Sequence, residues 1–247
     1  MNYLADFAWS VLIQPAAKLW VPALISIVFA GFGRVVRGVT TSGAAAGALV
    51  CFVLLIGAGP SGLIALFAVF LLTWAATRIG YARKQSLGTA ERRAGRNAAQ
   101  VFANLGVACV CAGIYAIGWR DSRMLIALIA ALAEAAADTV SSEIGQAVGG
   151  VPRLVTNWKP VPAGTDGAIT LAGTAAGVAA ASAVSLSGVV GSGLGWRSAP
   201  ICAAAAIVGM IADSFLGATL ERRGFLDNNA VNFSSTAIAA MIAFAMS

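Results

Sequence analysis

The sequence predicts an all-α protein: a polytopic integral membrane helical bundle of about eight transmembrane helices, with an active site that opens on the cytoplasmic side. Hydrophobic residues make up 59% of the 247 residues and charged residues only 11%, whereas soluble chains carry about 25% charged residues. The charges are also clustered, so that they bracket apolar runs close to the ~20 residues that a helix needs to cross a bilayer. This composition excludes a soluble globular enzyme, a disordered chain and a coiled coil.

The apolar runs define the spans in order along a single membrane domain, residues 1–247. Residues 57–62 are rich in glycine and proline, so the long apolar region around them is predicted to be a helical hairpin. Residues 1–17 contain Asp6 and lack a basic start, which argues against a cleaved signal peptide; this segment either extends the first span or forms a short interfacial segment. The predicted spans are 19–33, 42–57, 61–77, 97–119, 124–149, 167–190, 199–220 and 232–246.

Basic residues are distributed unequally between the two faces that these spans define. Twelve of the 16 Lys and Arg residues lie on the loops after the first, third, fifth and seventh spans, and the other face holds Lys18, Arg120, Arg123 and Arg197. The positive-inside rule places the more basic face in the cytoplasm. We therefore expect a multi-pass protein of a prokaryotic plasma membrane with both termini outside.

Two residue types narrow the chemistry. The chain has no histidine, which excludes Ser-His-Asp triads, Cys-His nucleophiles, HExxH zinc sites and His-ligated haem. Its four cysteines, Cys51, Cys109, Cys111 and Cys202, lie within apolar runs and form no CxxC. We expect them to be buried apolar side chains rather than metal ligands or disulfides.

Carboxylates inside the predicted spans point to a site, because each costs about 2.5–3.5 kcal/mol on insertion scales. Glu134, Asp138 and Glu143 lie on the fifth span and Asp213 on the seventh. Asp138 and Asp213 each lie 14 residues from the outer end of their span, which places both about 21 Å from that face and about 9 Å below the cytoplasmic one. A stripe of amides on the fourth span reaches the same level: Asn97, Gln100 and Asn104.

Paired carboxylates with neighbouring amides suit magnesium, and the basic loop 78–96 suits phosphate or an anionic head group. That loop is also explained by topology and lipid contact alone. The loop 150–166 carries Lys159 and ends in Gly164–Gly167, where Asp166 either caps the next helix or adjoins backbone N–H groups that receive a phosphate. Together, these features favour phosphoryl or nucleotidyl transfer to a lipid in a membrane-embedded site. The sequence contains no Walker A motif and no kinase glycine-rich loop, which excludes the common soluble nucleotide-binding folds.

Five ordered motifs resemble a membrane family that contains the plant phytyl-phosphate kinase. Residues 138–145 are similar to its DT-x-x-SE-x-G motif and residues 95–104 to its GR…QV-x-AN segment, and three further segments complete the pattern at 164–170, 213–218 and 231–233. More distantly, Asp138, Thr139 and Lys159 resemble the CTP-dependent group of phosphatidate cytidylyltransferase and the polyprenol kinases. Only Lys159 remains of that group's lysine-rich signature.

The resemblance implies a magnesium-dependent kinase of isoprenoid salvage that converts a phytyl, geranylgeranyl or farnesyl monophosphate to the diphosphate. The donor would be a nucleoside triphosphate, CTP rather than ATP, and the partners would be membrane lipids and no nucleic acid. Asp138, Asp213 and Glu143 would hold the metal, while Arg96 and Lys159 would neutralise the transferring phosphates. The predicted cofactor-binding residues are Asn97, Gln100, Asn104, Thr139, Thr165, Asp166 and Asn232.

The acceptor chemistry fits a chain without histidine, because a phosphate monoester is mostly dianionic at neutral pH and needs no general base. Two other functions stay open. An ion-coupled transporter also uses buried acids, although here the strong polar residues lie toward one face. A CTP-dependent lipid nucleotidyltransferase would release pyrophosphate instead of a nucleoside diphosphate.

Overall fold

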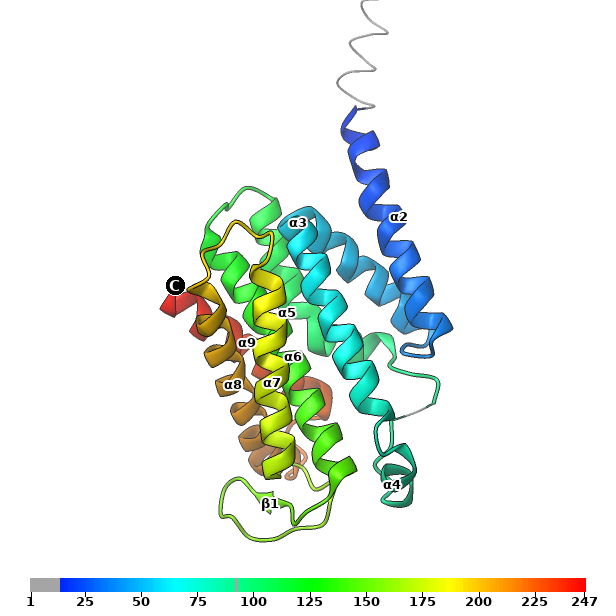
Figure 1. The fold of residues 1–247 in the computed structure, drawn as a ribbon, viewed down its shortest axis with the longest axis vertical. Helices are drawn as coiled ribbons and strands as arrows, with labels where there is room; N and C mark the ends of the chain where they lie inside the picture. Colours follow the sequence, from blue (N-terminus) through cyan, green and yellow to red (C-terminus); the bar gives the residue numbers. More distant parts are fainter. Residues whose placement is uncertain (1–13, 92) are drawn as a thin grey trace, which may run out of the picture.

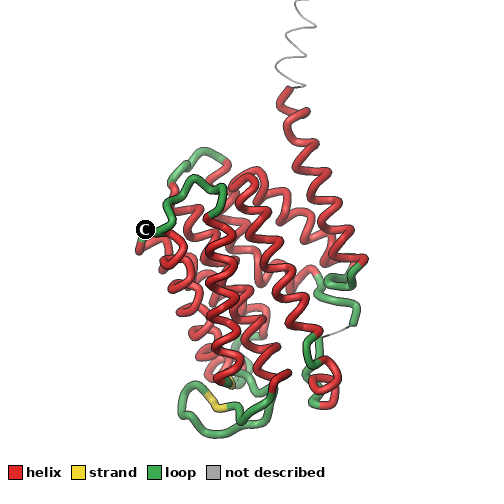
Figure 2. The backbone as a smooth tube through the Cα atoms, in the orientation of Figure 1, coloured by secondary structure: helices red, strands yellow, loops and turns green. Residues whose placement is uncertain are grey.

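The computed structural model describes residues 14–91 and 93–247, and this part of the chain is nearly all helical (Figure 2). Residues 1–13 of the predicted segment 1–17 lie outside the described residues. The helices are α2 (Gln14–Val35), α3 (Thr41–Arg78), α4 (Tyr81–Ser86), α5 (Ala98–Ala116), α6 (Ser122–Val148), α7 (Leu171–Val189), α8 (Ser198–Leu216), the π-helix η2 (Gly217–Glu221) and α9 (Asn228–Met246). Two short strands, β1 (Arg153–Leu154) and β2 (Ala168–Ile169), pair antiparallel.

The predicted fold class, a polytopic helical membrane bundle, is confirmed. Six of the described helices are long and apolar enough to cross a membrane, and α2 adds a shorter apolar stretch, Leu19–Val35. One of the six, the 38-residue α3, contains two of the predicted spans. Each of the eight predicted spans therefore has a helical counterpart in the described chain.

The chain reverses within α3, as the hairpin prediction requires (Figure 1). Gly59 has φ 63° and ψ −147°, a backbone conformation that suits glycine, and Pro60 then begins the second half. The reversal brings the end of α3 back beside the segment that precedes this helix. There, Trp74 Nε1 donates to the carbonyl oxygen of Val36 at 3.2 Å. Arg78 donates to the same oxygen.

Helix α6 lies at the centre of the bundle. Protein buries 89% of its most apolar 18-residue stretch, compared with 33–44% in the other candidate spans. Helix α7 approaches it closely through small residues: a Cβ on Gly173 would collide with the carbonyl oxygen of Ser141, and one on Gly177 would lie 2.9 Å from that of Ala137. Because α6 is enclosed by other helices, its carboxylates are surrounded by protein rather than lipid.

The two ends of the bundle differ in the way the charge pattern predicts. Helix α4 and the β1–β2 loop lie at one end, and the C-terminus lies toward the other (Figure 1). The end with α4 carries the basic loops that follow the odd-numbered predicted spans. Cys51, Cys111 and Cys202 are buried free thiols, as predicted, whereas Cys109 is only half-buried.

Two boundaries differ from the prediction for local reasons. Helix α7 begins at Leu171 instead of 167, because Thr170 is its N-cap and accepts from the Gly173 N–H. Helix α9 begins at Asn228 instead of 232, because the Asp227 carboxylate accepts from the Ala230 N–H. The short elements α4, β1 and β2 were not predicted, since segments of two to six residues carry too little periodicity to detect.

Candidate functional site

Helices α6 and α8 bring Asp138 and Asp213 together. The two carboxyl groups lie close enough to interact directly, and Ser235 on α9 donates its hydroxyl to Asp213 Oδ2 at 3.2 Å. Both aspartates are half-buried. The predicted meeting of these two side chains is therefore observed, with a hydroxyl from a third helix beside them.

Glu134 lies one helical turn before Asp138, and its carboxyl group is close enough to interact with those of both aspartates. Its side chain is only 1% exposed, and its Oε1 has no hydrogen-bond partner in the described part of the chain. Helix α8 fits against it at Gly209, where a Cβ would lie 2.6 Å from Glu134 Cγ. The acidic region thus extends inward from the aspartate pair along one face of α6.

Arg96 adjoins this pair and is held by its backbone. Its N–H donates to the Gly38 carbonyl at 3.1 Å and its own carbonyl accepts from the Thr40 N–H at 2.9 Å. Gly43 allows this approach, because a Cβ there would collide with the Arg96 carbonyl oxygen. The guanidinium donates to Thr139 Oγ1 at 3.3 Å and attracts the Asp138 carboxylate.

The loop that carries Thr165 and Asp166 docks beside the end of α8. Gly167 has φ 73°, and a Cβ on it would lie 2.5 Å from the Ser214 carbonyl oxygen. The carboxylate of exposed Asp166 is close enough to repel that of Glu221 in η2. The Glu221 carboxylate is also close enough to interact with that of Asp213, so η2 and this loop lie near the aspartate pair, and π-helical turns occur often at functional sites. Thr165 itself donates to the Pro162 carbonyl at 2.7 Å.

The predicted amides on α5 make their hydrogen bonds at the start of that helix. Asn97 and Gln100 form a capping box: each side chain accepts from the other's backbone N–H, at 3.0 and 2.9 Å. Gln100 also donates to Glu91 Oε2 at 3.2 Å. Asn104 is 7% exposed and donates to the Gln100 carbonyl at 2.8 Å. None of these hydrogen bonds joins the amides to Asp138 or Asp213.

Glu143 is placed apart from the aspartates, which corrects its predicted grouping with them. Its carboxylate pairs with Lys84 Nζ and accepts from Thr77 Oγ1 at 3.3 Å. The Lys84 side chain is fully buried and also donates to the carbonyl oxygens of Ala76 and Thr77, at 3.0 and 2.8 Å. Sequence reasoning missed Lys84 because it stands among basic residues that are mostly exposed.

Two further predicted residues lie outside the group around the aspartates. Lys159 is exposed on the loop after α6, where its backbone N–H donates to Asn157 Oδ1 at 3.0 Å. Asn232 lies half-buried in α9, and its carbonyl accepts from the Ser235 and Thr236 hydroxyls, both at 3.0 Å. Asn232 thereby supports the helix turn that presents Ser235 to Asp213.

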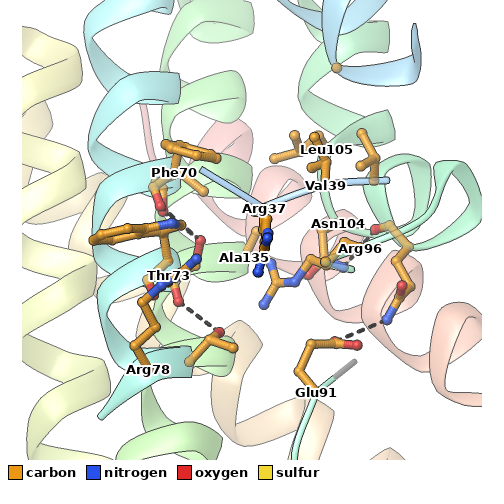
Figure 3. A pocket seen from close by; sticks show the side chains of 18 of the residues that line it. Arg37, Val39, Phe70, Thr73, Arg78, Glu91, Arg96, Asn104, Leu105 and Ala135 are labelled. Atoms are coloured by element: carbon orange, nitrogen blue, oxygen red, sulfur yellow. Dashed lines mark hydrogen bonds between the residues drawn. The ribbon is translucent and has the colours of Figure 1, made fainter. Parts of the chain in front are cut away.

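A pocket of about 410 Å³ opens on the other side of Arg96. Figure 3 shows Arg37 and Arg96 lying between Thr73 and Arg78 on α3 and Asn104 on α5. The rim includes Arg37, Arg78, Arg93 and Arg96 together with Glu91, and apolar side chains line the interior. Sequence reasoning found the basic loop but missed this cavity, because its wall combines α2, both halves of α3 and α5.

Asp138 and Asp213 supply two carboxylates for the predicted magnesium. No group of three or more His, Cys, Asp or Glu side chains with metal-binding geometry is found among residues 14–91 and 93–247. Magnesium, however, is usually bound by only one or two carboxylates together with substrate phosphates and water. The Asp138–Asp213 pair fits a metal that arrives with a nucleotide better than one held by protein alone.

Comparison with known proteins agrees with the motifs. A family model described as "Integral membrane protein DUF92" matches residues 24–240. The chain is 32% identical over 246 residues to Protein VTE6, chloroplastic, of Arabidopsis thaliana, covering 95% of this chain and 74% of that protein. It is also 32% identical over 274 residues to Protein PGR of the same plant, covering 90% and 93%.

A prokaryotic relative matches over a similar length. The chain is 34% identical over 233 residues to an uncharacterized membrane protein of Methanocaldococcus jannaschii, covering 93% of this chain and 94% of that protein. No solved structure matches the chain. These matches confirm the resemblance to the plant membrane family that the motifs indicated.

Proposed function

This chain belongs to the integral membrane family DUF92, and we propose that it is a lipid kinase that transfers the terminal phosphoryl group of a nucleoside triphosphate to an isoprenyl monophosphate. The observation that carries the proposal is the Asp138–Asp213 carboxyl pair with Arg96 beside it. Acidic groups for a metal–triphosphate and a cation for the transferring phosphate are the parts that phosphoryl transfer requires. Similarity to VTE6 supports the lipid-phosphate class of substrate through the family resemblance.

In the proposed reaction, an oxygen of the lipid monophosphate forms a bond to the terminal phosphorus of the triphosphate. The bond from that phosphorus to its bridging oxygen breaks, and a nucleoside diphosphate leaves. Magnesium, when bound with the nucleotide, supplies positive charge to the triphosphate oxygens. Asp138 and Asp213 would hold that metal, and Ser235 orients the Asp213 carboxylate through its hydrogen bond.

Arg96 stabilises the negative charge that is shared between the two substrates during transfer. Its backbone hydrogen bonds to residues 38–40 fix its position before substrates bind, and such preorganisation makes a cation effective in transition-state stabilisation. No residue has to accept a proton from the attacking group, because the monophosphate is already largely dianionic at neutral pH. CTP as donor and phytyl, geranylgeranyl or farnesyl monophosphate as acceptor are the substrates we propose.

The test is turnover of the purified protein in detergent with each of the three isoprenyl monophosphates and each of four nucleoside triphosphates. We expect an isoprenyl diphosphate and a nucleoside diphosphate in equal amounts, with magnesium required. Asp138→Asn should abolish turnover while the protein still folds, because the amide loses a charged ligand at nearly unchanged volume. The matched control is Asp121→Asn, the same change at the other end of α6, which should retain activity.

Other products would contradict the kinase proposal. Release of pyrophosphate would instead identify a nucleotidyltransferase. Flux of a solute through reconstituted vesicles without nucleotide consumption would identify a transporter. Normal turnover by Asp138→Asn would remove Asp138 from metal binding.

A further inference from the structure

We infer that the arginine-rimmed pocket between α2, α3 and α5 is the binding site of the acceptor lipid monophosphate, and that the absent side chain of Gly47 leaves the space for its hydrocarbon tail. This inference rests on the proposed function and deepens it, since it assigns the acceptor to a cavity separate from the carboxyl pair. The pocket is lined by residues of both kinds that such a molecule needs, a cationic rim and an apolar interior.

The rim is suited to a phosphate monoester. Its four arginines outnumber its one carboxylate, Glu91, and the hydrogen bonds or ring contacts of three of them are with neutral groups, although Arg96 also attracts Asp138. Arg78 donates to the Trp74 carbonyl at 3.2 Å, Arg96 donates to Thr139 Oγ1, and the Arg93 guanidinium lies 5.7 Å from the centre of the Tyr81 ring. A cluster with this excess of positive charge, in a planar donor geometry, matches a dianionic phosphate.

The interior is suited to a hydrocarbon chain. Phe29, Leu66, Val69, Phe70 and Leu105 line it. Leu66 lies 12 residues before Arg78 on the second half of α3, so the pocket extends about 18 Å inward from the rim. A lipid bound with its phosphate at the arginines would therefore place its tail along α3, parallel to the chains of the surrounding bilayer.

Gly47 differs from the glycine one turn before it. A Cβ on Gly43 would collide with the Arg96 carbonyl, so that glycine is required by a backbone contact, whereas a Cβ on Gly47 would meet no atom within 4 Å. A glycine inside a helix costs roughly 1 kcal/mol relative to alanine, and at position 47 no contact within the protein explains it. Since Gly47 lines the pocket, the space beside it belongs to the cavity.

Arg96 joins the pocket to the carboxyl pair. It lines the rim, while its guanidinium reaches Thr139 and attracts Asp138 on α6. A phosphate bound at Arg96 would thus lie next to the donor nucleotide, as in-line transfer between two bound substrates requires.

The experiment measures binding without nucleotide and turnover with it, for geranyl and geranylgeranyl monophosphates. In a series Gly47→Ala, Gly47→Val and Gly47→Leu, the Kd and KM for the longer lipid should rise stepwise. Gly47→Leu should reach at least about tenfold, the loss expected when roughly two methylene groups are no longer buried. Gly31→Leu is the matched control, because a Cβ on Gly31 of α2 would also meet no atom within 4 Å and this residue lies outside the pocket lining.

The outcomes separate this inference from the proposed function. If every Gly47 variant keeps the chain-length preference of the unmodified protein and turns over normally, the tail lies elsewhere and the inference fails while the kinase proposal stands. If the Gly47 variants bind the longer lipid more weakly than the unmodified protein, as predicted, but the unmodified protein transfers no phosphate, only the kinase proposal fails. If phosphatidate vesicles or inorganic phosphate displace the bound lipid equally well from the unmodified protein and from every Gly47 variant, the pocket is a general anion site and the inference is overturned.

Discussion

Asp138 and Asp213 lie close enough for two negative charges to repel, so a cation between the two carboxyl groups would stabilise the pair. Their depth was predictable, because both helices run in the same direction and each residue advances an α-helix by 1.5 Å. Their partners were less predictable. Glu143 follows Asp138 by five residues and is therefore rotated by about 140° around α6, whereas Glu134 precedes it by four and shares its face.

The Lys84–Glu143 pair has a structural role that can be measured. Removing one member leaves the other buried without its partner, which typically costs 3–5 kcal/mol. We expect Lys84→Met to lower the free energy of unfolding by about 3 kcal/mol, and Lys84→Met/Glu143→Gln to recover much of that loss. Unfolding by SDS in mixed micelles provides the measurement.

The exposed pair Arg123–Asp121 offers a control, since the Arg123 side chain is 45% exposed. Arg123→Met should change the free energy of unfolding far less than Lys84→Met does. Equal effects of the two substitutions, or no recovery in the double variant, would show that Lys84 and Glu143 are not energetically coupled.

At the scale of helices, the contact between α6 and α7 depends on small side chains. Gly145 and Gly173 face each other, and a Cβ on Gly173 would lie 3.1 Å from Gly145 Cα. Gly173→Val should therefore separate the helices and lower the free energy of unfolding by roughly 1–3 kcal/mol. Gly31→Val, at an exposed position of α2 with open space around it, should have little effect in the same assay. A loss as large at Gly31 would mean that the valine itself, rather than the contact, causes the change.

The sequence indicated the helices well but the roles of the polar residues at the starts of α5 and α7 poorly. Asn97 and Gln100 have the spacing of a polar stripe, yet the same spacing is that of a capping box, and the orphan N–H groups of a helix start favour capping. Asp166 was open to interpretation as a cap, but Thr170 takes that position. Polar residues at a helix start can therefore be explained by capping alone, and their presence there does not by itself indicate a functional site.

For the whole molecule, the charge asymmetry predicts which end faces the cytoplasm. The test uses a chain with its four cysteines replaced by alanine and one new cysteine at an exposed position. Val151→Cys lies on the loop after α6, at the basic end, and Ile117→Cys lies at the end of α5, at the other. A membrane-impermeant maleimide should label position 151 only from the cytoplasmic side and position 117 only from outside. The reverse labelling pattern would place the carboxyl pair near the outer face.

The arrangement of the whole bundle explains what sequence reasoning could and could not reach. Hydrophobic runs and the Gly59–Pro60 break specify the spans, because each is a property of one segment. The pocket and the burial of Lys84 depend on how α2, α3, α4 and α5 meet, and no single segment carries that information. The motif resemblance indicated both aspartates and Arg96, which the structure brings together from three separate segments.

The most direct test of the account is binding of Mn²⁺ in place of magnesium, measured by electron paramagnetic resonance with a non-hydrolysable nucleoside triphosphate. The account predicts that the unmodified protein binds the metal–nucleotide complex and that Asp138→Asn and Asp213→Asn each weaken binding by about tenfold or more. Asp121→Asn and the double variant Lys84→Met/Glu143→Gln should bind as the unmodified protein does. Unchanged binding in both aspartate variants, or loss of binding in the Lys84–Glu143 variant alone, would contradict it.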